Sequence, residues 1–220
     1  PEDRLRTLSV LAERGIATAC RIQPLLPRYE QEAFELIESC GNLGVRQIAV
    51  EHLKLPIETG PRGGARISQA LSFDVHTQYM QRGAQRMGRE WVLPVEQRLP
   101  LILELRSAAW AMGLAFGAAD SDLLHLSDGM SCCSGIDTLG FETGYRFTFT
   151  HAIHASKDGL VRFSDIEDEW RPGRSIGRYV NSSSRLAQAS VDEYVRRAWN
   201  GAANGPSPAM YYGVTRTDQV

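Results

Sequence analysis

The sequence predicts an α/β protein on two observations. Segments with apolar residues at helical spacing alternate with short apolar runs, in the order helix, strand, helix, strand, over residues 5–50. Helices and strands at this spacing favour parallel strands joined by right-handed crossovers. Further along, a long helical segment at residues 95–112 leads into another apolar run at residues 114–118, which predicts a third strand of the same kind.

The first two helix–strand pairs have clear start and stop signals. The first helix is predicted by leucines at helical spacing, namely Leu5, Leu8 and Leu11, and Gly15 ends it. Residues 16–23 form a buried strand closed by two prolines. A second helix covers residues 29–40, with its inner face formed by Ala33, Phe34, Ile37 and Cys40. Residues 45–50 then form the second strand.

The middle of the chain is less regular. A Gly/Pro-rich break at residues 60–64 precedes a weakly helical, polar stretch at 67–87. The long helix at 95–112 contains Pro100, which must lie near its start or bend it, because proline lacks the N–H that a helix interior needs. The third strand at 114–118 follows directly.

The pattern changes after residue 137, which predicts a division into residues 1–137 and 138–220. Residues 145–150 alternate like a strand or run into a helix through His151 and His154. Ser190 and Glu193 form a capping-box pattern at the start of a later helix.

Composition limits the classes of function. The 220 residues carry a net charge of −2, which gives no overall case for nucleic-acid binding, although a local basic face stays open. No apolar stretch approaches the ~20 residues that cross a bilayer. The four cysteines are too few for a disulfide framework, which favours reduced thiols and a cytoplasmic protein.

Residues 118–137 gather the most chemistry, directly after the third strand. They contain four aspartates, His125 and the adjacent pair Cys132 and Cys133. His125 and Asp128 are candidates for acid–base catalysis or for binding a divalent metal. The alternative is a turn whose aspartates accept hydrogen bonds from backbone amides. Cys132 and Cys133 are candidates for catalysis as a hydrogen-atom donor, for a redox pair or for metal ligands, although cysteine is also a common buried residue.

Two stretches resemble a known family. The first contains Arg4-Leu5, Gly15-Ile16 and the strand end Arg21-Ile-Gln-Pro-Leu-Leu-Pro27; the second contains Asp122-Leu-Leu-His-Leu-Ser-Asp128 and Cys132-Cys133-Ser-Gly135. They resemble the later barrel segments of radical SAM enzymes, in the group similar to spore photoproduct lyase that is often labelled DNA repair photolyases.

The resemblance implies a fold and a set of cofactors. Residues 1–137 would form later βα units of a partial TIM-type barrel, and residues 138–220 a mixed α+β extension. The implied cofactors are S-adenosylmethionine and a [4Fe–4S] cluster, and the implied activity is radical hydrogen abstraction of a lyase type, with the substrate left open. The CxxxCxxC motif that holds such a cluster does not occur here. We therefore expect its cysteines upstream of Pro1, in a parent protein of which this chain is a carboxyl portion that is inactive alone.

Residues at the ends of the first two strands are candidates for cofactor binding, because strand carboxyl ends face the active site of a barrel. They are Arg21, Gln23, Glu51 and Lys54, with His52 beside them. The alternative is that ion pairs and loop hydrogen bonds satisfy these side chains.

Two further groups have weaker signals. His151 and His154 would share a helical face and are a surface pair unless a third ligand joins them. Arginines alternate with aromatic residues at Arg171, Arg174, Arg178 and Arg185, a pattern that suits a phosphate surface or a solvated face.

Three functions follow. The first is the carboxyl portion of a radical SAM enzyme. The second is a self-contained metal-dependent hydrolase centred on His125 and Asp128. The third is a non-catalytic binding module.

Overall fold

The structure is a computed structural model of the whole chain. It describes residues 2–57, 61–129, 135, 137–140, 149–156, 158–166, 196–197, 199–201 and 208–216. The chain forms two compact units, Pro1–Leu114 and Ala115–Val220. The division lies between the long helix and the predicted third strand, whereas the sequence pattern changes after residue 137.

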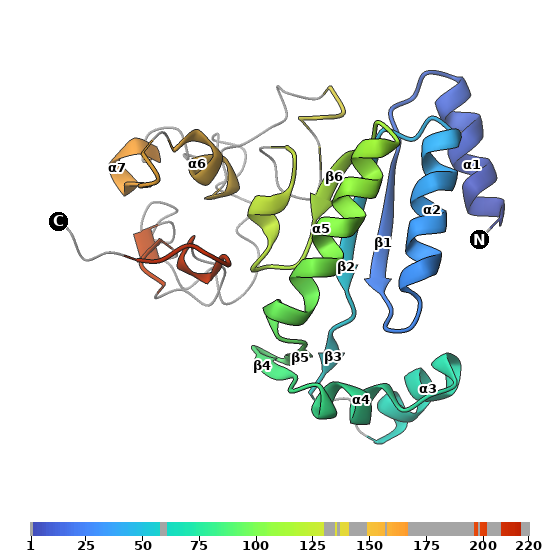
Figure 1. Cartoon of the computed structure of the whole chain (residues 1–220), viewed down its shortest axis with the longest axis horizontal. Coiled ribbons are helices and arrows are strands. Elements are labelled where there is room, and N and C mark those ends of the chain that lie inside the picture. The colour runs from blue at the N-terminus through green and yellow to red at the C-terminus, as the bar shows by residue number, and fades with distance from the viewer. Residues whose placement is uncertain are drawn as a thin grey trace, which may run out of the picture. The chain divides into compact units, whose positions relative to one another are not determined.

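The first unit begins with the predicted alternation of helices and strands (Figure 1). Its first elements are α1 (Glu2–Glu13), β1 (Ala19–Leu25), α2 (Glu30–Asn42) and β2 (Gln47–His52). Strands β1 and β2 are parallel, in a register that pairs Arg21 with Ala49 and Leu25 with His52. The register shifts between Ile22 and Leu25, where a proline has no N–H for the ladder. The α/β class with parallel strands is therefore confirmed.

The buried faces of these elements follow from their sequences. Ala33, Ile37 and Cys40 lie three or four residues apart and form the buried face of α2, whereas Phe34 is only partly buried. In β2 the run Ile48, Ala49 and Val50 is buried on both faces, as is usual for a parallel strand under helices. Helix α2 packs on β1, α5 (Val95–Ala111) packs on β2, and the two helices also contact each other.

A small antiparallel sheet completes the first unit. Its strands are β3 (Leu55–Pro56), β4 (Gln85–Met87) and β5 (Glu90–Val92), in the order β3-β5-β4. The polar stretch predicted as weakly helical divides into α3 (Pro61–Leu71), α4 (Val75–Gln81) and the β4 strand. The break before α4 has a local cause, because the carboxylate of Asp74 accepts the Thr77 N–H at 3.0 Å and so begins a new helix. Leu53, Leu55, Val75, Tyr79 and Leu93 form the buried cluster of this region.

The second unit begins with β6 (Ala115–Ala118), the predicted third strand. A 3-10 turn, η1 (Leu124–Leu126), follows, and then α6 (Phe149–Ala155), α7 (Phe163–Ile166) and a second 3-10 turn, η5 (Pro208–Met210). Phe149, Ala152 and Tyr211 form its buried cluster. Of the two structures predicted for residues 145–154, the helix is present from Phe149 onward; residues 145–148 and the capping box at Ser190 lie outside the described residues.

The strands of the described residues do not close into a barrel. They form two three-stranded sheets, one with parallel and one with antiparallel pairing. The partial TIM-type barrel is thus not confirmed and stays a prediction. None of the helices that the structure describes is long and apolar enough to span a membrane.

Candidate functional site

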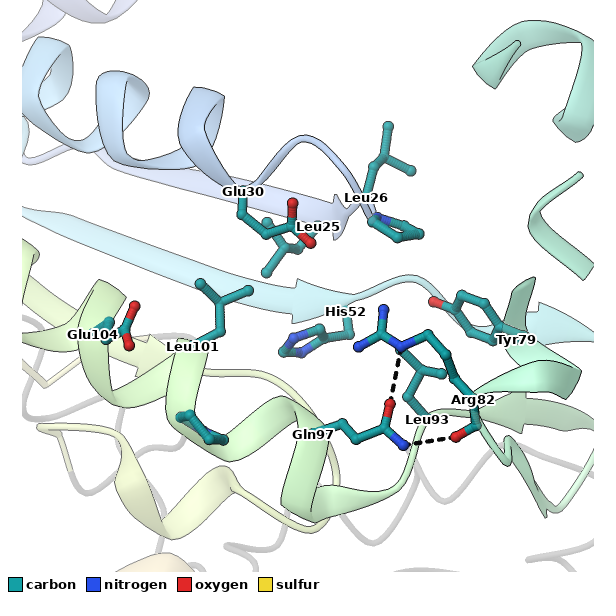
Figure 2. A pocket seen from close by; sticks show the side chains of 12 residues that line it. Leu25, Leu26, Glu30, His52, Tyr79, Arg82, Leu93, Gln97, Leu101 and Glu104 are labelled. Carbon is teal, nitrogen blue, oxygen red and sulfur yellow. Dashed lines mark hydrogen bonds between the residues drawn. The ribbon is translucent and has the colours of Figure 1, made fainter. Parts of the chain in front are cut away.

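A pocket lies at the carboxyl ends of β1 and β2 in the first unit. It encloses about 260 Å³, and the last residues of the two strands, Leu25 and His52, both line it. Most of the other lining residues come from helices α2, α4 and α5 (Figure 2). In parallel α/β sheets this edge is where ligands bind, because loops and helix starts meet there.

The floor of this pocket is buried and fixed. Tyr79, from α4, is only 1% exposed, and its hydroxyl donates a hydrogen bond to the carbonyl oxygen of Leu53 at 2.7 Å. The Leu53 N–H in turn donates to the Leu25 carbonyl oxygen at 3.0 Å, which ties the two strand ends together. His52 is 8% exposed, so its ring is a polar group on a mainly apolar floor.

The rim of the pocket carries charged and amide side chains. Glu30 is the first residue of α2, Arg82 follows α4, and Gln97 and Glu104 lie on α5. Arg82 and Gln97 hold each other: Nε of the arginine donates to Oε1 of Gln97 at 2.9 Å, and Nε2 of Gln97 donates to the Arg82 carbonyl oxygen at 2.6 Å. Figure 2 shows both bonds, which fix the direction of the arginine side chain.

The residues predicted to bind a cofactor are not among those that line this pocket. Gln23 and Lys54 both donate hydrogen bonds to the Glu51 carboxylate, and Arg21 is exposed on β1. Successive side chains of a strand point to opposite faces, so Glu51 and His52 point in different directions. For Gln23, Glu51 and Lys54 the geometry matches the alternative of mutual pairing, and their cofactor role stays a prediction.

Sequence reasoning missed most of the pocket. Tyr79, Arg82 and Gln97 stand in stretches without a motif, and Glu104 is one exposed acid of a long helix. The signal in the sequence is positional, because His52 stands at a strand end.

In the second unit, Asp128 and Ser127 hold the segment after β6 against that strand. The Asp128 carboxylate accepts the Phe116 N–H at 2.7 Å, and the Asp128 N–H donates to the Phe116 carbonyl oxygen at 2.9 Å. The Ser127 hydroxyl accepts the Ala118 N–H at 3.0 Å. In these bonds an aspartate accepts a backbone N–H, which is the alternative to catalysis that the sequence analysis gives for this segment.

His125 lies in a different environment from Asp128. Its ring stacks on Tyr211 with centroids 5.5 Å apart, and its carbonyl oxygen accepts a hydrogen bond from Nε2 of His154 at 2.7 Å. Burial, and then the nearby His154, hold the pKa of His125 below its ordinary value despite the opposing effect of Asp122. His125 also lines a second cavity of about 580 Å³ with Trp199, Tyr212 and Arg216.

Among the residues that the structure describes, no three His, Cys, Asp or Glu side chains are placed to hold a metal ion. Cys132 and Cys133 lie outside those residues, as do Arg171, Arg174, Arg178 and Arg185, and their predicted roles are unchanged. Cys20 and Cys40 are free thiols, and a hydrogen bond between them lowers the pKa of Cys20 and raises that of Cys40.

The chain matches no family model, no curated protein and no solved structure in the three comparisons made. The geometry of the pocket therefore carries the functional argument.

Proposed function

We propose that this chain supplies later βα units of a radical SAM enzyme and that the pocket at the ends of β1 and β2 belongs to its reaction site. The resemblance rests on residues in α1, in β1 and at its end, and after β6. The observation that carries the proposal is the pocket itself, at the strand edge where a barrel enzyme of this kind performs its chemistry.

The implied cofactors fit the described residues only in part. The described cysteines, Cys20 and Cys40, are two thiols joined by a hydrogen bond, so they cannot supply the three thiolates that a cluster needs. We therefore derive no reaction step through the cluster, whose ligands the proposal assigns to the parent protein. When bound, the cluster and S-adenosylmethionine would supply a 5′-deoxyadenosyl radical. The contribution of this chain is to bind and orient a ligand between the charged rim and the buried floor, and to exclude water there.

The test uses the protein encoded by the whole reading frame that contains this chain. It is purified without oxygen, reconstituted with iron and sulfide, reduced with dithionite and given S-adenosylmethionine. We expect the absorption and electron paramagnetic resonance signals of a [4Fe–4S] cluster, together with 5′-deoxyadenosine in the products. A reading frame without a three-cysteine cluster motif, or a reconstituted protein that forms no 5′-deoxyadenosine, would overturn the proposal.

A further inference from the structure

We infer that the pocket at the ends of β1 and β2 binds a small zwitterion of the amino-acid type as substrate. The ammonium group would lie at the carboxylates of Glu30 and Glu104, and the carboxylate at the guanidinium group of Arg82. The inference rests on the proposed function only in taking this pocket as the reaction site.

The charges around the pocket carry the first step. Within the described part of the chain, no ion-pair partner is found for the carboxylates of Glu30 and Glu104 or for the two Nη groups of Arg82. Figure 2 shows these three side chains around one cavity, from α2, α5 and the end of α4. A cationic ligand would leave the positive charge of Arg82 without a partner, and an anionic ligand would leave the carboxylates of Glu30 and Glu104 without one. A zwitterion carries groups of both charges and can therefore pair with all three side chains.

The orientation of the Arg82 guanidinium group suits the binding of a carboxylate. Gln97 binds its Nε and fixes the plane of the guanidinium group, so the two Nη groups can bind two oxygens side by side. A lysine in this position would offer a point charge without that geometry.

A metal ion is a poorer occupant than an organic ligand. Glu30, Glu104 and His52 line the same pocket, yet within the described part of the chain no group of three His, Cys, Asp or Glu side chains is placed to hold a metal ion. These three residues come from three different elements, α2, α5 and β2, and an organic ligand can contact each of them with a separate group.

The size and the floor of the pocket limit the ligand further. A volume of about 260 Å³ is below the roughly 300–1,000 Å³ of sites for drug-sized molecules. Leu25, Tyr79 and Leu93 present apolar surface at the floor, which suits an aliphatic side chain.

The test measures binding of three probes by isothermal titration calorimetry. L-leucine carries both charges, isopentylamine lacks the carboxylate, and 4-methylpentanoate lacks the ammonium group. We expect L-leucine to bind at least about tenfold more tightly than either analogue. Equal affinity for all three, or no binding of L-leucine, would overturn the inference.

Substitutions test which side chain binds the carboxylate of the ligand and which binds its ammonium group. Arg82→Gln should remove the preference of the protein for L-leucine over isopentylamine, and Glu104→Gln should weaken its preference over 4-methylpentanoate. Arg89→Gln and Glu96→Gln, exposed and outside the pocket, are the matched controls and should leave both preferences unchanged. Circular dichroism checks that every variant is folded. Controls that act like the pocket variants would contradict the assignment.

The outcome is separable from that of the proposed function. If 5′-deoxyadenosine forms and L-leucine does not bind, this inference fails alone and the proposed function stands. If L-leucine binds with the expected dependence on Arg82 but no 5′-deoxyadenosine forms, the proposed function fails and the zwitterion site stands.

Discussion

Glu51 and His52 are neighbours at the end of β2, yet they have different roles. The Glu51 side chain accepts hydrogen bonds from Gln23 and Lys54, and the His52 ring lines the pocket. The cause is the pleat of the strand, which sends successive side chains to opposite faces. At this scale, the identity of a residue says less about its function than the face on which it lies.

Tyr79 should stabilise the pocket floor through its hydroxyl group. Tyr79→Phe leaves the Leu53 carbonyl oxygen without this donor in a buried position, so we expect the free energy of unfolding to fall by about 1–2 kcal/mol. Urea denaturation measures the change. Tyr29→Phe, at an exposed tyrosine, is the control and should stay within about 0.5 kcal/mol. Equal effects of the two substitutions would contradict the prediction.

His125 should make stability depend on pH. Because burial lowers its pKa in the folded state, the unfolded chain takes up a proton below about pH 6.5 that the folded chain does not. The free energy of unfolding should therefore decrease as pH falls through that value, and level off below the lowered pKa. His125→Gln should lose less stability than the unmodified protein between about pH 8 and pH 5 in urea denaturation. An unchanged pH dependence would contradict this.

The two thiols of the first unit should differ in reactivity. The hydrogen bond from Cys40 favours the thiolate of Cys20, and Cys40 itself is fully buried. Iodoacetamide should therefore modify Cys20 first, as followed by peptide mass spectrometry. In Cys40→Ala the rate at Cys20 should fall, because the hydrogen bond is lost. Faster modification of Cys40 would show that the assignment is wrong.

At the scale of elements, α2 meets the residue that follows α5 at Gly41. A Cβ atom at this position would lie 2.8 Å from Cβ of Met112 and 2.7 Å from its Cε. An alanine normally stabilises a helix relative to glycine, but here one of the overlapping atoms is attached directly to the partner backbone and cannot turn away. Close packing against Met112 therefore favours glycine over alanine at position 41.

Gly41→Ala should lower the free energy of unfolding by about 1–3 kcal/mol through overpacking. Asn42→Ala, at the next and exposed position of α2, should change it by less than about 0.5 kcal/mol. Thermal and urea unfolding measure both. Met112→Gly removes the overlapping Cβ and Cε, so in the Gly41→Ala background it should recover part of the loss, and no recovery would mean that the overlap is not the cause.

At the scale of the whole molecule, each compact unit has a buried cluster of its own. The cluster around Leu55 lies within the first unit, and the cluster around Tyr211 within the second. Local contacts of this kind predict that the units lose protection from hydrogen exchange separately.

Leu55→Ala should therefore speed hydrogen exchange within residues 2–57 and 61–114, and Tyr211→Ala within residues 149–156. Each substitution removes buried apolar contacts from one cluster only. Hydrogen-exchange mass spectrometry reads the two regions in one experiment. Loss of protection to the same extent in both regions with either variant would contradict separate units.

The sequence by itself determined the α/β class, the order of the first four elements and the buried face of α2. These depend on periodicity and on local stop signals such as Gly15, which act over a few residues. Pro24 was wrongly predicted to close the first strand, since β1 continues through it to Leu25. The sequence also pointed to the ends of β1 and β2 as a place for ligands, and His52 stands there.

Only the tertiary structure decided which side chains line the pocket. Arg82, Gln97 and Glu104 come from elements that follow β2 by 30 residues or more, and only packing of α4 and α5 brings them to the strand ends. It also turned Glu51 toward Gln23 and Lys54, and Asp128 toward the backbone of β6. The physical reason is that periodicity fixes which face of an element is buried, whereas the neighbours across that face depend on how distant segments meet.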